Sequence, residues 1–177
     1  MMNLVYKILK TRKEVDDLIS LLVRNGKFVV DLETTGLETF SPDLKIVGIG
    51  FSVKTFEAYY VPFNAPEWAT ELEGDPSTVL LDLFKPILED PCLGKIGQNI
   101  KYDCRVFRKF GVRLQGIVFD TLLASYCLFS DKCKHSLDDM SMNHFGHIKI
   151  RTKSVIPKKK KKKGEAPSTM WDAPVDE

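Results

Sequence analysis

One short stretch constrains the fold of this chain more than any other: an apolar run followed at once by two acids and a glycine turn. Phe28, Val29 and Val30 are apolar and β-prone, and Asp31 and Glu33 follow one residue apart. The run is typical of a strand buried on both faces. Side chains at i and i+2 of a strand point to the same side, so we expect the two acids to project together.

Two carboxylates held this close repel each other unless a cation neutralises them. Hard cations such as Mg²⁺ and Mn²⁺ prefer oxygen ligands, which predicts a metal site at Asp31 and Glu33. The plainer interpretation is a pair of solvated surface charges, because D-x-E triplets are common. Their position directly after an apolar strand favours the metal site.

A second polar motif lies downstream at residues 97–103, with the sequence Gly-Gln-Asn-Ile-Lys-Tyr-Asp. Asn99 and Asp103 are four residues apart and therefore share one face of a helix. Asp103 is a candidate third carboxylate for the same metal cluster, and Asn99 offers an amide to a substrate or to a ligand. The alternative is that Asn99 caps the helix and Asp103 is a surface charge.

The bulk properties fit one globular domain in a reducing compartment. The 177 residues carry a formal charge of +2, but a run of six lysines at 158–163 accounts for it, since 2 − 6 = −4 for the remainder. Net charge therefore gives no support for nucleic-acid binding. None of the four cysteines forms a C-x-x-C pair, and no signal peptide or membrane span is visible, so we expect a cytoplasmic protein.

The hydrophobic periodicity predicts alternating strands and helices up to about residue 150. The capping box at Thr11 and Glu14 starts a helix that Gly26 ends. Three early strands without a long helix between them predict an antiparallel meander. Asp120 is interpreted as a helix cap. Tyr60 is interpreted as a residue packed in the sheet, with a role in stacking on a base as the alternative. The other expected elements are strands at 5–9, 46–53, 58–61 and 93–97, and helices at 99–110, 121–129 and 136–145. A further helix starts at Asp75 and Pro76, has its buried face over 79–87, and is expected to be kinked or shortened at Pro86.

The two motifs, in this order, resemble the proofreading 3′→5′ exonuclease domain of bacterial family A DNA polymerases, that is, DNA polymerase I. The resemblance covers about residues 5–150. Long matches in the same order make it specific, where a single D-x-E would not. The matching stretches are 30–37, 46–48, 83–90, 97–103 and 119–121, with a weaker match at 135–137.

The resemblance implies an α/β fold of the ribonuclease H-like type, in which a mixed sheet of antiparallel meander and parallel strands is flanked by helices. It implies removal of nucleotides from the 3′ end of single-stranded DNA with two divalent ions, Mg²⁺ or Mn²⁺, and a polymerase domain as partner in cis or in trans. By resemblance, three of the family's four metal-binding carboxylates are Asp31, Glu33 and Asp103. The matching positions near the terminal nucleotide are Thr34, Leu37, Gln98, Asn99 and Tyr102.

The chain departs from the family at the fourth carboxylate, which belongs to a Tyr-x-x-x-Asp motif. No tyrosine follows Tyr126. We therefore expect residues 1–150 to form an exonuclease-like domain that is incomplete at its C-terminal end, and 151–177 to form a lysine-rich loop or disordered tail. We expect a fragment of a longer or split polymerase, with weak or no activity. The alternatives are a non-catalytic nucleic-acid-binding or structural module, and an RNA exonuclease of the ribonuclease D type.

Overall fold

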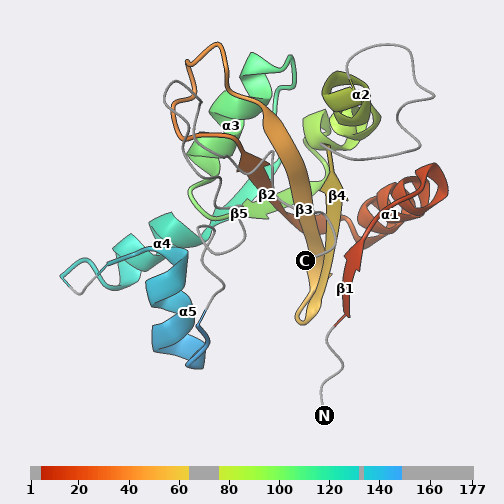
Figure 1. The fold of residues 1–177 in the computed structure, drawn as a ribbon. Coiled ribbons are helices and arrows are strands. Elements are labelled where there is room, and N and C mark those ends of the chain that lie inside the picture. The colour runs from red at the N-terminus through yellow and green to blue at the C-terminus, as the bar shows by residue number, and fades with distance from the viewer. Residues whose placement is uncertain (1–4, 64–75, 132–133, 149–177) are drawn as a thin grey trace, which may run out of the picture.

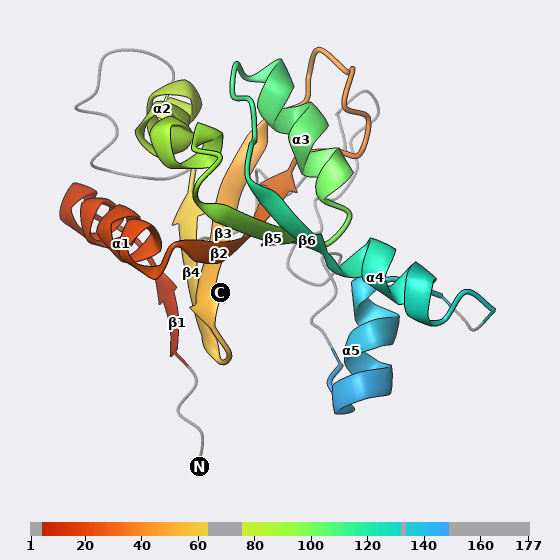
Figure 2. The same cartoon turned by 180° about the vertical axis from the view of Figure 1, so that it is seen from behind.

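The computed structural model describes residues 5–63, 76–131 and 134–148. Six strands form one sheet in the order β1-β4-β3-β2-β5-β6, and helices surround it (Figures 1 and 2). The strands are β1 (Val5–Ile8), β2 (Lys27–Thr34), β3 (Ile46–Lys54), β4 (Glu57–Pro62), β5 (Gly94–Gly97) and β6 (Ile117–Asp120). The helices are α1 (Arg12–Asn25), α2 (Pro76–Glu89), α3 (Ile100–Lys109), α4 (Thr121–Leu128) and α5 (Leu137–Phe145).

The sheet combines the two strand pairings that the sequence predicts. β2, β3 and β4 form the antiparallel meander. β1 joins β4 in parallel on one side, and β5 and β6 continue from β2 in parallel on the other. Parallel neighbours need crossover connections, and α2 and α3 lie in the two connections that lead to β5 and β6.

Local sequence signals set the ends of α1 as expected. The Glu14 backbone N–H donates to Thr11 Oγ1 at 3.3 Å, and the Thr11 N–H donates to Glu14 Oε2 at 3.1 Å. This capping box satisfies amides that have no partner within the helix. Gly26 ends the helix with φ of 71°, a left-handed conformation that glycine adopts without strain.

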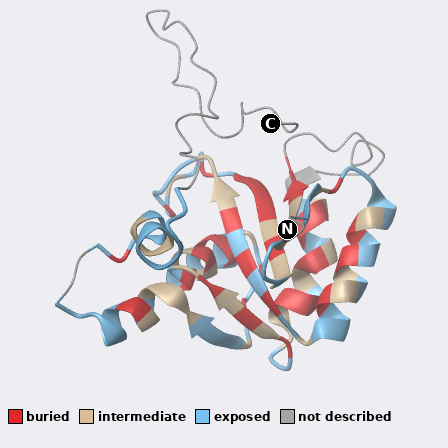
Figure 3. Ribbon diagram, turned by 90° about the horizontal axis from the view of Figure 1, so that it is seen from below, coloured by how far each residue is buried: buried red, intermediate tan, exposed pale blue. Residues whose placement is uncertain are grey.

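The core lies between the sheet and the inward sides of α1 and α2. Phe51 stacks on Phe84 with ring centroids 5.0 Å apart, and Phe28 meets Phe51 edge-on at 5.9 Å. In Figure 3 the buried residues follow the sheet and the inward sides of these neighbouring helices. Pro86 lies within α2, which continues to Glu89.

The expectation that β2 is buried on both faces is wrong. Phe28, Val30 and Leu32 are buried, but Val29 is 38% exposed and points to the other side. A short run of apolar residues shows no alternating pattern, so it cannot tell a strand with one buried face from a strand with two. One face of β2 is therefore open, and this is the face that carries Asp31.

Some predicted features fall outside the described residues. These are most of the loop at 62–76, Cys133 and the tail at 151–177 with its lysine run. Cys92, Cys104 and Cys127 are free thiols. Within the described part of the chain, no helix is both long and apolar enough to cross a bilayer.

Candidate active site

The two acids of β2 lie on the open face of the sheet, as their spacing predicts. Asp31 is paired across the antiparallel ladder with Gly50, and Glu33 with Gly48. Paired residues of neighbouring strands share a face. Beside Asp31, Gly50 leaves this surface without a side chain, whereas the space over Gly48, beside Glu33, is taken by the ring of Tyr60.

Asp103 joins these acids from α3. Its side chain is 3% exposed. Burial, together with the carboxylates of Asp31, Asp120 and Glu33, raises the pKa of Asp103 to about 8, against an opposing hydrogen bond from the backbone of Leu32. A buried acid among like charges holds its proton until a positive charge replaces it. The structure thus brings the three predicted carboxylates together.

A small hydrogen-bonded cluster ties the end of β2 to α3. Thr34 Oγ1 and Tyr102 Oη are 2.7 Å apart, and Tyr102 Oη lies 2.7 Å from the carbonyl oxygen of Gly36. Burial raises the pKa of Tyr102, which keeps its phenol neutral. Two of the predicted substrate positions, Thr34 and Tyr102, therefore fix the turn that follows the acidic strand.

The remaining predicted substrate positions divide into exposed and internal groups. Leu37 is 88% exposed, which leaves its side chain free to contact a ligand. Asn99 is also exposed. Gln98 instead faces inward: its amide nitrogen donates to the His135 carbonyl at 3.2 Å and its amide oxygen accepts from Thr121. Its contacts support neighbouring elements.

Tyr60 lies beside this site, although the sequence favoured packing within the sheet over a stacking role. It is paired with Gly50 and so shares the open face. A Cβ built on Gly48 would lie 2.3 Å from Tyr60 Oη, so the phenol rests against that glycine. Burial and the charge of Glu33 raise the pKa of Tyr60 and keep it neutral. The two glycines one residue apart in a strand were a usable signal, because they mark close approach of another group.

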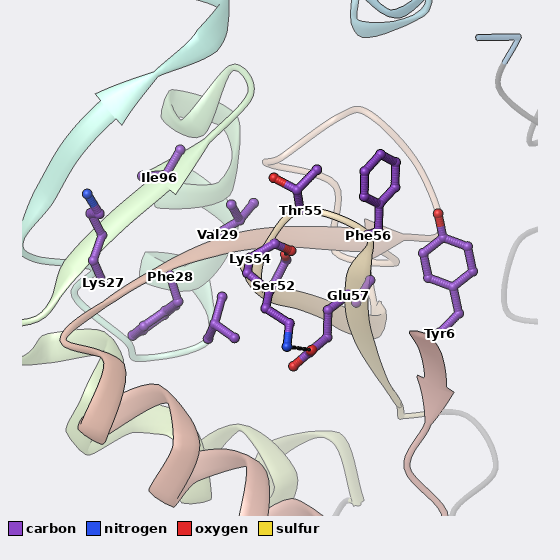
Figure 4. A pocket seen from close by; sticks show the side chains of 12 residues that line it. Tyr6, Lys27, Phe28, Val29, Ser52, Lys54, Thr55, Phe56, Glu57 and Ile96 are labelled. Atoms are coloured by element: carbon purple, nitrogen blue, oxygen red, sulfur yellow. Dashed lines mark hydrogen bonds and ion pairs between the residues drawn. The ribbon is translucent and has the colours of Figure 1, made fainter. Parts of the chain in front are cut away.

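The open face of the sheet is hollowed beside these acids. One cavity of about 380 Å³ is lined by Asp31, Gly50 and Tyr60, among others. A second, of about 420 Å³, shares Val29 and Tyr6 with it and extends toward Phe56. Figure 4 shows the side chains that line the second cavity, among them Lys54 and Glu57, whose ion pair joins Lys54 Nζ to a Glu57 carboxylate oxygen at 2.6 Å. Together they form a groove that ends at Asp31.

A sequence model of the family described as 3′-5′ exonuclease matches residues 6–171, nearly the whole chain. The chain belongs to the 3′-5′ exonuclease family. DNA polymerase I of Pseudomonas aeruginosa is 36% identical to it over 130 residues. That match covers 72% of this chain and 14% of the polymerase, so the chain spans about one seventh of this relative's length.

Solved structures show the same fold at lower sequence identity. Trypanosoma brucei RNase D has a TM-score of 0.63 at 11% identity, covering 86% of this chain and 53% of that one. Brucella melitensis NrnC with bound Mg²⁺ has a TM-score of 0.55 at 17% identity, covering 84% and 65%. These similarities establish the ribonuclease H-like architecture that the family resemblance implied.

The donor chemistry of this candidate site fits a divalent cation. Asp31, Glu33 and Asp103 provide carboxylate oxygens, the ligands that hard cations prefer. The pKa of Asp103 is raised first by burial and then by the neighbouring carboxylates, and a bound cation would offset the charge of those carboxylates. Within residues 5–63, 76–131 and 134–148, no three Asp, Glu, His or Cys side chains are already arranged as a closed ligand cluster. Binding of a metal ion by all three acids would therefore require their side chains to rearrange.

Proposed function

We propose that this protein is a 3′→5′ exonuclease domain that removes nucleotides from the end of single-stranded DNA with two divalent ions, Mg²⁺ or Mn²⁺. The observation that carries the proposal is the buried carboxyl of Asp103, whose pKa is raised by burial and by Asp31, Asp120 and Glu33. Such a concentration of like charge destabilises the metal-free domain, and strongly perturbed carboxylates of this kind cluster at functional sites. Membership of the exonuclease family indicates the function of this one.

Asp31, Glu33 and Asp103 would hold the metal ions. Metal ligands must be deprotonated, so metal binding would release the proton that Asp103 holds in the free protein. When bound, a pair of such ions supplies an activated water and stabilises the leaving 3′ oxygen. Gly50 leaves room beside Asp31 for the phosphate of the substrate, and the Tyr60 phenol over Gly48 would border that space.

The strand end would lie against the turn that follows β2. Leu37 presents an apolar surface for the terminal base, since bases of single strands pack on apolar and aromatic side chains. Thr34 and Tyr102 hold this turn, and the exposed amide of Asn99 is available for hydrogen bonding. Gln98 would support the substrate site indirectly, through the hydrogen bonds of its amide with Thr121 and with the His135 carbonyl.

Three acids without the fourth predict low activity. These 177 residues contain no tyrosine after Tyr126 and so no Tyr-x-x-x-Asp motif in their last part. We expect slow hydrolysis, or metal and DNA binding with no measurable hydrolysis. A polymerase domain, in cis or in trans, is the expected partner, and the cytoplasm, where its DNA substrate lies, is the expected location.

DNA is the expected substrate over RNA because the matched relative is a DNA polymerase. The second candidate, an RNA exonuclease, is favoured only by the shared fold with RNase D. Parallel assays on DNA and RNA strands of one sequence separate the two.

The decisive experiment combines metal binding with end-specific hydrolysis. Calorimetry with Mn²⁺ should detect binding to the wild type, weakened at least about 100-fold in Asp31→Asn and Asp103→Asn. Release of nucleotides from 3′-labelled linear single-stranded DNA should require the metal and be lost in the same variants. Asp17→Asn, on the exposed side of α1, is the matched control and should behave as wild type.

Two results would contradict the proposal. One is a wild type that binds neither Mn²⁺ nor single-stranded DNA. The other is metal-dependent cleavage of a circular single strand at the rate of the linear one, which would indicate an internal nuclease. Robust activity abolished by Asp31→Asn would support the proposal and show that the expected weakness is wrong.

A further inference from the structure

The carboxylate of Asp120 makes more contacts than a helix cap requires. Asp120 is the last residue of β6, and its Oδ1 accepts from the Leu122 N–H of α4 at 2.8 Å, the expected cap. The same carboxylate also accepts from Asn99 N–H at 3.0 Å and from Ile100 N–H at 3.0 Å. One side chain therefore caps two helices, its own and α3.

The start of α3 depends on this external cap. Asn99 occupies the N-cap position with φ of 55° and ψ of 42°, and its own side chain makes no capping hydrogen bond. Left-handed geometry costs energy at any residue other than glycine, though Asn tolerates it best. Asp120 supplies the acceptor that Asn99 does not, and two helix N-termini stabilise its negative charge.

Further contacts tie the same turn to α4. Thr121, which follows Asp120, donates to the Gly97 carbonyl at 3.2 Å and also contacts the Gln98 amide. The turn from β5 into α3 is thus held at Gly97, Gln98, Asn99 and Ile100 by two consecutive residues. Asp103 lies in the first turn of α3, so the direction of its carboxyl follows from where and how that helix begins.

We propose that Asp120 is a positioning residue of the exonuclease site, which holds the first turn of α3 so that Asp103 and Asn99 face the acids of β2. The chemical part of this inference rests on the proposed function. Its structural part rests on the three hydrogen bonds that the Asp120 carboxylate accepts. Asp120 touches neither substrate nor metal in this role. Its carboxylate is occupied by the three backbone amides.

Two variants of Asp120 test this assignment. Asp120→Ala removes all three acceptor contacts. Asp120→Asn keeps one oxygen for Asn99 and Leu122 but turns an N–H₂ toward the Ile100 amide. We expect amide exchange at Ile100 to accelerate at least about 10-fold in the alanine variant and less in the asparagine variant. We expect Mn²⁺ affinity to fall about 10- to 100-fold in the alanine variant. In the asparagine variant it should fall less.

Ser136→Ala is the matched control, because it removes the cap of α5, where Ser136 Oγ accepts from the Asp139 N–H at 3.2 Å. It should leave Mn²⁺ affinity unchanged. All affinities are measured at a temperature at which near-ultraviolet circular dichroism shows each variant folded. A purely structural role for Asp120 would lower the melting temperature and leave the Mn²⁺ affinity of the folded protein unaltered.

The outcomes separate the two proposals. If Asp120→Ala leaves exchange at Ile100 at the wild-type rate, the positioning role is wrong whatever the metal data show. If exchange accelerates but Mn²⁺ affinity does not change, Asp120 is a helix cap and not part of the site. If the wild type itself binds no Mn²⁺, the proposed function fails, and the role of Asp120 at the site fails with it while its effect on exchange at Ile100 is still measured.

Discussion

Two regions of the molecule are held together by different forces. In the packed half, which comprises β2 to β4 with α1 and α2, side chains such as Val15, Leu22 and Leu80 are fully buried. In the outer region, which comprises β6, α4 and α5, Leu128 is 73% exposed and Val118 58%. α4 is apolar all round, a composition typical of a buried helix, yet Ser125 is its one buried residue.

Polar contacts hold the outer region where apolar burial is lacking. Ser125 Oγ lies 2.8 Å from His135 Nδ1, and the Tyr126 ring lies against the His135 ring with centroids 3.8 Å apart. Asp120 and Thr121 link β6 and α4 to the start of α3. Figure 2 shows α4 and α5 extending from the end of β6, away from α1 and α2.

The candidate site lies at the boundary between these regions. Asp31 and Glu33 come from the packed half, whereas Asp103 comes from a helix whose first turn is fixed by the outer region. Core packing sets the two carboxylates of β2. The third comes from α3, whose Ile100, Val106 and Phe107 pack in the same core, but whose first turn is also held by hydrogen bonds from Asp120. A change in the outer region can therefore alter the site without unfolding the domain.

The largest expected difference between the regions is in how far the free energy of unfolding falls when an apolar side chain is removed. Phe84→Ala, at a fully buried position stacked on Phe51, should lower the free energy of unfolding by about 3–5 kcal/mol. Leu128→Ala should change it by no more than about 0.5 kcal/mol, because that side chain is largely in water already. Urea denaturation of both variants measures the contrast. A cost for Leu128→Ala close to that of Phe84→Ala would mean that something covers the outer region in solution.

The next largest effect concerns the pH dependence of stability at the boundary. The folded-state pKa of Asp103 is about 8, against a usual value of 3.8, so the folded protein retains a proton that the unfolded chain releases. The contribution of Asp103 to the free energy of unfolding of the metal-free protein should therefore be greatest below about pH 4. It should fall by up to about 1.4 kcal/mol per pH unit toward pH 8 and level off above it.

Asp103→Asn removes this slope, since asparagine does not titrate. We expect the variant to be more stable than wild type at pH 8 by on the order of 3 kcal/mol, and to differ little from it near pH 4. Asp82→Asn, at an exposed position of α2, is the control and should keep the wild-type profile. Identical profiles for wild type and Asp103→Asn would show that Asp103 is not surrounded by the charges of Asp31 and Glu33 in solution.

Local signals explain which parts of this fold could be predicted. The capping box at Thr11 and the shared face of Asp31 and Glu33 depend on residues within a few positions of one another, and both predictions are confirmed. The exposure of Val29 could not be read from its neighbours, because it depends on what covers the sheet. The place of Tyr60 depends on a strand pairing that sets it beside Gly50 and against Gly48.

The same reasoning applies to Asp120 and Gln98. The sequence predicts Asp120 as the cap of α4 because Leu122 is two residues away, and this is confirmed. Its contacts with Asn99 and Ile100 cross 21 and 20 residues, and only the packing of β5 beside β6 brings them together. Family resemblance placed Gln98 near the substrate, but its contacts with Thr121 and His135 could come only from the folded structure.

A smaller effect is expected at two glycines near the boundary. Gly116 and Gly111 both have positive φ, of 67° and 79°. A Cβ on Gly116 would lie 2.3 Å from the Leu93 carbonyl oxygen, whereas one on Gly111 would meet nothing within 4 Å. Gly111→Ala should cost about 1 kcal/mol of backbone strain. Gly116→Ala should cost about 1–2 kcal/mol more, because the backbone between β5 and β6 must move.

Chemical denaturation of this matched pair measures the excess directly. The Lys95 N–H donates to the Gly116 carbonyl at 2.7 Å, so loss of this contact should also speed exchange of the Lys95 amide. Equal costs for the two substitutions would show that the junction of β5 and β6 is loose enough to absorb a methyl group. In that case the outer region would hold α3 less firmly than its hydrogen bonds indicate.

The smallest expected effect is the stability lost when a helix cap is removed, and it can be compared between the two regions. Thr11→Ala removes the capping box of α1, whose Val15, Leu18 and Leu22 are buried, so it should lower the global free energy of unfolding by about 1 kcal/mol. Ser136→Ala removes the cap of α5, which has no buried residue. We expect it to fray that helix, seen as faster exchange of its amides, while the urea midpoint stays at the wild-type value. A shift of the midpoint by Ser136→Ala as large as that by Thr11→Ala would mean that α5 unfolds together with the packed half, and that the two regions form one cooperative unit.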